Sequence, residues 1–140
     1  MYDESKHTQV RGDAVAVSGG AGTQATVQWL PEFSNVSFET VPNNKKLVLT
    51  DVLYNPQGDV TAAHWINIAE KRPNGTTEII IQFCVPPNAT QQVHFHTGHV
   101  IEPGKSVVVY TDANPPSGQH FSVAINGYLA KLKTKRLFFK

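Results

Sequence analysis

Residues Thr77–Val85 read Thr-Glu-Ile-Ile-Ile-Gln-Phe-Cys-Val, and this run decides the fold class. β-Branched and aromatic residues favour the pleated backbone of a strand, and a nearly continuous apolar run is typical of a strand covered on both faces. Residues 72–75, which read Arg-Pro-Asn-Gly, precede the run, and Pro86 ends it. Asn-Gly between two strand patterns indicates a hairpin. We therefore expect a central strand, joined by a hairpin to the segment before it.

Outward from this run, apolar and polar residues alternate along most of the chain. Proline, glycine and asparagine mark the turns between these segments, as in residues 55–59 and 102–105. An irregularity near Asp51 predicts a β-bulge. No window shows sustained helical periodicity. Strands are expected at 25–30, 36–41, 46–54, 63–69, 77–85, 92–96, 106–111 and 120–129.

Short strands separated by turns at this spacing are typical of an all-β sandwich or barrel. About eight of them predict an antiparallel two-sheet β-sandwich of the jelly-roll type. The 140 residues fit one domain. We expect the sandwich over residues 25–130, after an extended glycine-rich arm at residues 1–24. A basic, aromatic tail at residues 131–140 follows and could add an edge strand.

Composition narrows the partners and the chemistry. The net charge of +1 gives no strong field for nucleic acid or an anionic membrane, so neither is an expected partner. The single cysteine, Cys84, excludes an intrachain disulfide and is expected to be a buried free thiol. The polar start Met1–Ser5 lacks the apolar core of a signal peptide. No nucleophile elbow, phosphate loop or acid–base pair is present, so neither an enzyme nor a cofactor is expected.

The densest polar cluster contains His94, His96 and His99. Two imidazoles at i and i+2 on a strand share a face and can chelate zinc, copper or iron. A cupin-like metal-dependent enzyme that uses His94 and His96, with His99 or His120 as a further ligand, is therefore one alternative. The acidic residue that a cupin needs is misplaced, because Glu102 lies too far along, at a turn. The favoured interpretation has Val93 and Phe95 facing the core and His94 and His96 facing outward, with no metal.

Two further patterns bear on recognition. Arg11-Gly12-Asp13 is the tripeptide that integrins bind, and it falls within the expected arm, although a chance match of three residues is the favoured interpretation. A carbohydrate-binding module would use exposed aromatics flanked by polar side chains. The candidate residues are Trp29, Trp65, Tyr54 and Tyr110 as the stacking platform, a role we rank below core packing, and Asp112, Asn114 and Gln119 as hydrogen-bonding groups in one loop.

Three stretches carry a resemblance to known proteins: residues 41–52, residues 98–107 and residues 121–129. A proline turn leads into Lys-Leu-Val-Leu-Thr, a Pro-Gly turn precedes a later strand, and the last strand ends in Gly-Tyr. Together they resemble small β-sandwich modules of phage virions, namely capsid decoration (cement) proteins and the heads of fibres. The resemblance covers roughly residues 38 to 130 and implies a jelly-roll-like fold, frequent trimers and no active site.

These observations predict a non-enzymatic structural protein of a virion. The expected form is a homotrimer that contacts other virion or shell proteins through the N-terminal arm and the C-terminal tail. A carbohydrate-binding or adhesive module is the first alternative, and the cupin-like enzyme is the second.

Overall fold

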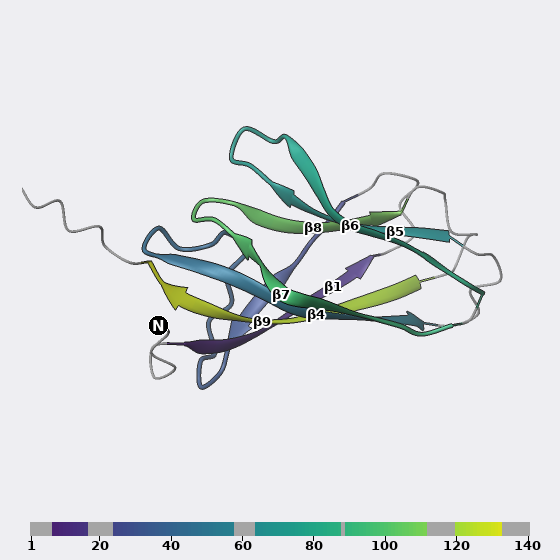
Figure 1. Ribbon diagram of the computed structural model, residues 1–140, viewed down its shortest axis with the longest axis horizontal. Helices are drawn as coiled ribbons and strands as arrows, with labels where there is room; N and C mark the ends of the chain where they lie inside the picture. Colours follow the sequence, from purple (N-terminus) through teal and green to yellow (C-terminus); the bar gives the residue numbers. More distant parts are fainter. Residues whose placement is uncertain (1–6, 17–23, 58–63, 88, 112–119, 133–140) are drawn as a thin grey trace, which may run out of the picture.

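The computed structural model describes residues 7–16, 24–57, 64–87, 89–111 and 120–132. They form nine strands and no helix, so none of them builds a helix that could cross a membrane. Figure 1 shows the strands in two layers. In chain order they are β1 (Thr8–Ala16), β2 (Ala25–Thr26), β3 (Gln28–Pro31), β4 (Lys45–Gln57), β5 (His64–Lys71), β6 (Thr77–Val85), β7 (Gln91–Ile101), β8 (Ser106–Thr111) and β9 (His120–Lys131).

The two layers are antiparallel sheets with many crossovers. The five-stranded sheet has the order β3-β1-β9-β4-β7, and the four-stranded sheet has the order β2-β8-β5-β6. Strands that are neighbours in space are mostly distant in sequence, as when β1 pairs with β9. This is the jelly-roll β-sandwich that the sequence predicts, with nine strands in place of about eight.

The core fills the space between the sheets with alternate side chains of each strand. Val123, Ile125 and Leu129 of β9 face inward, as do Ile66 and Ile68 of β5. Each such aliphatic side chain contributes about 1.5–3 kcal/mol through removal of apolar surface from water. The largest fully buried side chains are Trp29, Tyr54, Leu47, Leu49, Ile66, Ile68, Ile101 and Ile125.

The predicted bulge near Asp51 is confirmed. The pairing of β4 with β9 shifts register between Leu49 and Asp51. The hydroxyl of Thr50 donates a hydrogen bond of 3.0 Å to the carbonyl of Asn126 across this irregularity. The bulge moves the fully buried positions of β4 from the odd residues Leu47 and Leu49 to the even residues Val52 and Tyr54.

The predicted hairpin before β6 is also confirmed. The Gly75 amide donates to the Arg72 carbonyl at 2.9 Å, and the Arg72 amide donates to the Thr76 carbonyl at 2.9 Å. Gly75 has φ of 91°, a left-handed conformation that glycine adopts without a steric penalty. The loop is thus a turn closed by a left-handed glycine, as in three-residue hairpins.

The boundary expected at Ala25 is corrected, because the sandwich begins at β1. Residues 8–16 pair with β9 on one side and with β3 on the other, so part of the expected arm is an inner strand. Its buried residues are Val10, Gly12 and Ala14 at alternate positions, a weak apolar signal because two of them are small. The glycine-rich residues 17–23 and the tail residues 133–140 lie outside the described residues.

The strand expected at 36–41 reduces to two isolated bridges. Phe38 bridges Trp29 of β3, whereas Thr40 bridges Ser106 of β8. These partners belong to different sheets, so the chain crosses from one layer to the other within three residues and cannot extend either ladder.

The run Thr77–Val85 is a strand, but it is not central. Among the strands that the structure describes, β6 pairs with β5 alone and forms one end of the four-stranded sheet. The expectation of a buried Cys84 is corrected with it, because the thiol is exposed. Val85 takes the buried position, and side chains alternate along a strand.

Candidate functional site

The side of the sandwich closed by β6 and β7 is the surface that departs most from an ordinary protein exterior. β6 ends the four-stranded sheet and β7 ends the five-stranded sheet, with residues 86–90 connecting them. Figure 1 shows both strands running along the near side of the molecule. We call this surface, residues 79–101, the β6–β7 edge. Among the described residues, the outer backbone groups of both strands pair with no further strand.

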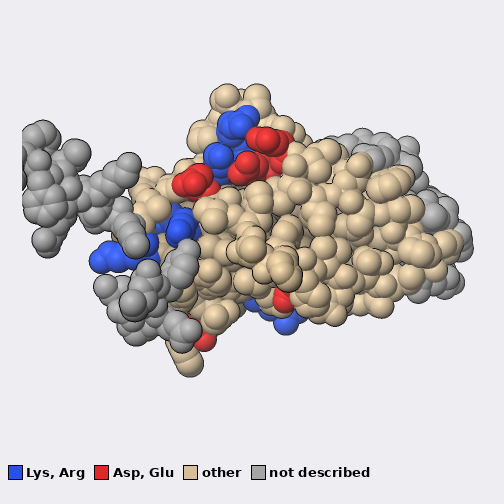
Figure 2. Space-filling view, in the orientation of Figure 1, with Lys and Arg blue, Asp and Glu red and all other residues tan. Residues whose placement is uncertain are grey.

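The β6–β7 edge has no formal charge at neutral pH, since no Asp, Glu, Lys or Arg occurs from Ile79 to Ile101. Charged groups lie beyond it, where Arg72 pairs with Glu78 at 3.0 Å and Lys105 pairs with Glu70 at 3.5 Å. Figure 2 shows Lys, Arg, Asp and Glu mainly over the left half and middle of this face, and a wide uncharged surface to the right, over β6 and β7. Edge strands of monomeric proteins usually carry charges that prevent pairing with other chains.

Apolar side chains are accessible at this edge. Ile79 is 49% exposed, and a further group of side chains packs against the core while remaining partly accessible. Phe83 belongs to this group and contacts the ring of Tyr54 edge-on at 6.5 Å between centroids. The described members of the group on β6 and β7 are Ile80, Ile81, Phe83, Val93 and Phe95. The interior of the sandwich is therefore incompletely covered on this side.

The histidines of β7 divide between two faces. His94 and His96 are exposed, and Val93 and Phe95, which alternate with them, pack against the core as predicted. His99 is half-buried, with its ring centroid 6.2 Å from that of Phe95 and its Nε2 buried without a hydrogen-bond partner among the described residues. The three therefore do not converge, and the described part of the chain gathers no group of three or more potential metal ligands. The side chain of His120 is not described.

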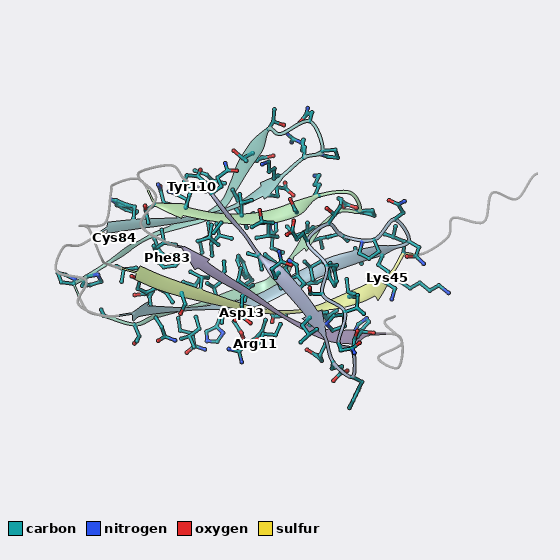
Figure 3. All side chains as sticks on the ribbon, turned by 180° about the vertical axis from the view of Figure 1, so that it is seen from behind. Arg11, Asp13, Lys45, Phe83, Cys84 and Tyr110 are labelled. Carbon is teal, nitrogen blue, oxygen red and sulfur yellow. The ribbon has the colours of Figure 1, made fainter. Side chains whose placement is uncertain are left out.

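The Arg-Gly-Asp sequence lies on a paired strand. Arg11 and Asp13 point outward from β1 and form an exposed ion pair, with Nε and Oδ1 3.5 Å apart. Figure 3 shows both on the outer side of the five-stranded sheet, away from Cys84 and Tyr110. Gly12 faces inward, where a Cβ atom would lie 2.5 Å from Cγ1 of Val27 and 2.7 Å from the ring of Trp29. Packing against Trp29 thus accounts for the glycine.

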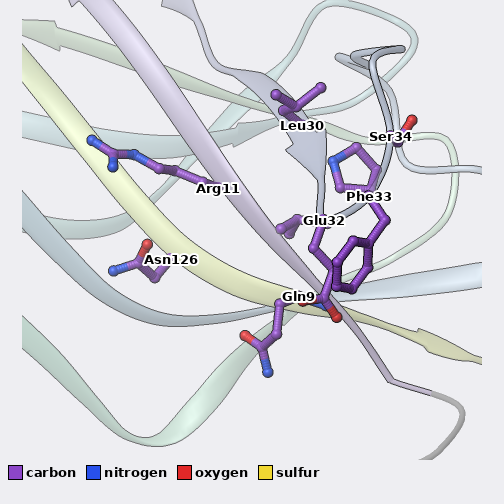
Figure 4. A pocket seen from close by; sticks show the side chains of 9 residues that line it. Gln9, Arg11, Leu30, Glu32, Phe33, Ser34 and Asn126 are labelled. Carbon is purple, nitrogen blue, oxygen red and sulfur yellow. The ribbon is translucent and has the colours of Figure 1, made fainter.

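A second exposed apolar cluster lies on the loop after β3. Phe33 is fully exposed at φ of 59°, and Leu30 and Val36 beside it are also exposed. The loop is nevertheless anchored, because the Glu32 amide donates to the Gln9 carbonyl at 2.8 Å. Figure 4 shows Phe33 at the rim of an open cavity of about 380 Å³ that Leu30 and Asn126 also line. No sequence signal marked Phe33, since its exposure depends on tertiary structure.

The carbohydrate candidates are separated by the fold. Trp29 and Tyr54 are fully buried, whereas Trp65 is 46% exposed and Tyr110 is half-buried on the outer side of the four-stranded sheet. Asp112, Asn114 and Gln119 lie outside the described residues. Two of the four aromatic candidates are therefore core residues.

Comparison with known proteins gives matches among solved structures only. No model of a protein family matches the chain, and no curated protein matches it. Eiger TNF from S. frugiperda matches with a TM-score of 0.49 and 11% identity, over 96% of this chain and 97% of that chain. Murine APRIL matches with a TM-score of 0.45 and 14% identity, over 91% and 100%. The jelly roll described above rests on the strand pairing of this chain.

Proposed function

We propose that this chain is a non-enzymatic structural subunit that works as a homo-oligomer, in the first instance a trimer, whose copies meet through the β6–β7 edge. The observation that carries the proposal is that both edge strands on one side of the sandwich lack any formal charge from Ile79 to Ile101. We propose three copies because the virion modules that the sequence resembles are frequently trimers.

Two features of the edge support burial against another copy. The sequence of β6 is that of a strand covered on both faces, yet Ile79 is 49% exposed and Phe83 is only partly buried. Among the described residues, β6 also pairs with a strand on one edge only. Ile81, Phe83 and Phe95 belong to the core but remain partly accessible. A second copy would remove this surface from water, at about 25 cal/mol per Å² of apolar area. A stable interface of this kind buries about 800 Å² on each partner.

Light scattering coupled to size exclusion tests the proposal. The wild-type chain is expected at three times the 15.4 kDa of one protomer. Ile79→Lys places a charge on the edge at a half-exposed position that tolerates it, so the monomer folds while the assembly dissociates. Gln28→Lys is the matched control, because Gln28 is exposed on β3, the opposite end of the five-stranded sheet. A wild-type monomer at all concentrations would overturn the proposal.

The setting suggested by the resemblance is the surface of a virion, where the subunit would decorate a capsid or form the head of a fibre. This part of the proposal rests on the turn sequences of residues 41–52 and 98–107. Mass spectrometry of purified particles from the host's phages would detect the chain as a stoichiometric component. Recovery of the chain only in soluble fractions would count against a virion role.

Carbohydrate binding is a second candidate, favoured by one observation. Trp65 presents half of its surface to solvent from β5, an inner strand, with Tyr110 on the neighbouring β8. An exposed aromatic face can stack on a sugar ring. A glycan array with wild-type protein and Trp65→Ala should show signals that the substitution removes. Silence of the wild-type protein across neutral and acidic glycans would dismiss this candidate.

A further inference from the structure

His94 and His96 form a pair that neither the core nor the hydrogen-bond network of the described residues uses. Both side chains are exposed on the same face of β7, because Val93 and Phe95 alternate with them toward the core. Residues at i and i+2 of a strand lie about 6.6–6.8 Å apart along it. Two imidazoles at that spacing can turn toward each other and place one nitrogen each on a shared ion.

The surroundings of the pair favour a cation. No Lys or Arg occurs on β7 or anywhere between Ile79 and Ile101. Asp51 is the cross-strand partner of His94, and its Oδ1 accepts a hydrogen bond of 3.1 Å from Nδ2 of Asn126. A carboxylate fixed beside an imidazole supplies negative charge near a bound metal and can orient a ligand.

We propose that His94 and His96 form a bidentate site for a divalent transition metal that prefers imidazole, with Zn²⁺ as the probe. The described part of the chain offers no group of three ligands, so one copy leaves two positions of a tetrahedral ion open. A neighbouring copy in the assembly supplies the remaining positions from its own His94 or His96. This last step rests on the proposed function, because β7 lies on the edge through which copies meet.

A zinc titration of untagged protein tests the site directly, because Zn²⁺ binds the neutral form of imidazole and the pH is held constant between variants. Competition with a chromophoric chelator is expected to give fewer Zn²⁺ ions than chains in the assembled wild-type protein. His94→Gln and His96→Gln each remove one ligand and should weaken binding by tenfold or more. His7→Gln is the control. It removes an imidazole just before β1, outside the strand that carries the pair, and should leave zinc affinity unchanged.

A relocated pair separates chelation from a general effect of the histidines. Gln92 is exposed on the same face of β7 as His94. The double variant Gln92→His with His96→Gln therefore restores an i, i+2 pair, and it is expected to recover most of the affinity that His96→Gln loses. Equal affinity of wild type and His94→Gln, or no rescue by the double variant, would overturn the site.

The monomeric edge variant distinguishes this inference from the proposed function. Ile79→Lys is expected to keep a weaker site with one Zn²⁺ per chain, because the pair stays intact while the second copy is lost. Co²⁺ substituted for Zn²⁺ should then lose the intense visible absorption of a tetrahedral ion. One Zn²⁺ per chain in an assembled wild-type protein would overturn the shared site, and a wild-type monomer that binds zinc through the pair would overturn the assembly alone.

Discussion

At Gly12 the sequence pattern and the structure give different explanations for the same residue. Arg11-Gly12-Asp13 matches an adhesion tripeptide, but the structure explains the glycine by the position of Trp29. A side chain at position 12 would overlap the buried side chains of Val27 and Trp29. The ion pair between the neighbouring Arg11 and Asp13 is exposed, so it stabilises the fold little. Packing against the core therefore explains the glycine, and exposure to solvent explains the charged residues on either side of it.

Gly12→Ala should therefore destabilise the fold. The added Cβ would lie 2.5 Å from Cγ1 of Val27, which overpacks the core and costs about 1–3 kcal/mol. Urea unfolding followed by tryptophan fluorescence measures this change. Asp13→Ala is the control and should shift the free energy of unfolding by less than about 0.5 kcal/mol. Equal stability of Gly12→Ala and wild type would show that the close approach is absent.

Phe33 stores strain without a packing gain. Its φ of 59° is unfavourable for a bulky side chain, and the ring is fully exposed. Phe33→Gly is expected to raise the free energy of unfolding by about 1 kcal/mol, because glycine adopts this conformation freely. Thermal unfolding checks the prediction. A lowered melting temperature would mean that the ring makes a stabilising contact.

At the scale of elements, the position of a strand in the sequence and its place in the sheet depend on different interactions. Alternation and turn residues predicted β4 to β9, the bulge at Asp51 and the hairpin at Gly75, because each depends on residues close in sequence. The order of strands depends on pairing between distant segments, which the pattern of one segment does not encode. β6 was accordingly expected at the centre and lies at the edge, and β1 was missed because two of its three buried residues are Gly12 and Ala14.

The same distinction applies to the candidate site. The missing charges of residues 79–101 were readable in the sequence, but they became informative only when both segments proved to be edge strands. The outward positions of His94 and His96 followed from alternation alone. The burial of Nε2 of His99 did not, since it depends on how Phe95 packs.

Gly98 lies in the stretch of β7 where the register against β4 shifts, so it is the place to test that element. Leu49 of β4 pairs with His99, whereas Asp51, two residues later, pairs with His94. Residues 95–98 of β7 therefore lie opposite the single residue Thr50 of β4. Gly98 has φ of 80°, and a Cβ there would lie 2.7 Å from Cγ1 of Val48. Gly98→Ala should cost about 1–3 kcal/mol. Denaturant unfolding measures it, and a neutral result would contradict the assigned register.

Stability of the whole molecule should fall in alkali because of Tyr54. Burial raises the pKa of this phenol from 10.0 to about 12, since the ionised form loses its hydration. The folded state therefore holds the phenol proton more tightly than the unfolded state. The stability that this difference contributes is fully present below pH 10 and is lost as the pH rises toward 12. The expected slope is about 1.4 kcal/mol per pH unit at most. Comparing unfolding of wild type and Tyr54→Phe at pH 9, 10 and 11 tests it. An identical slope for both would assign the pH dependence to other groups.

At the scale of the assembly, the central claim is that the β6–β7 edge is covered by another copy. Amide hydrogen exchange tests this claim most directly, because it reports the edge strands residue by residue. Outward-facing amides of β6 and β7 should exchange slowly in concentrated wild-type protein and quickly in Ile79→Lys, while the edge strand β3 should behave alike in both. Fast exchange throughout β6 and β7 in the concentrated wild-type protein would contradict the account.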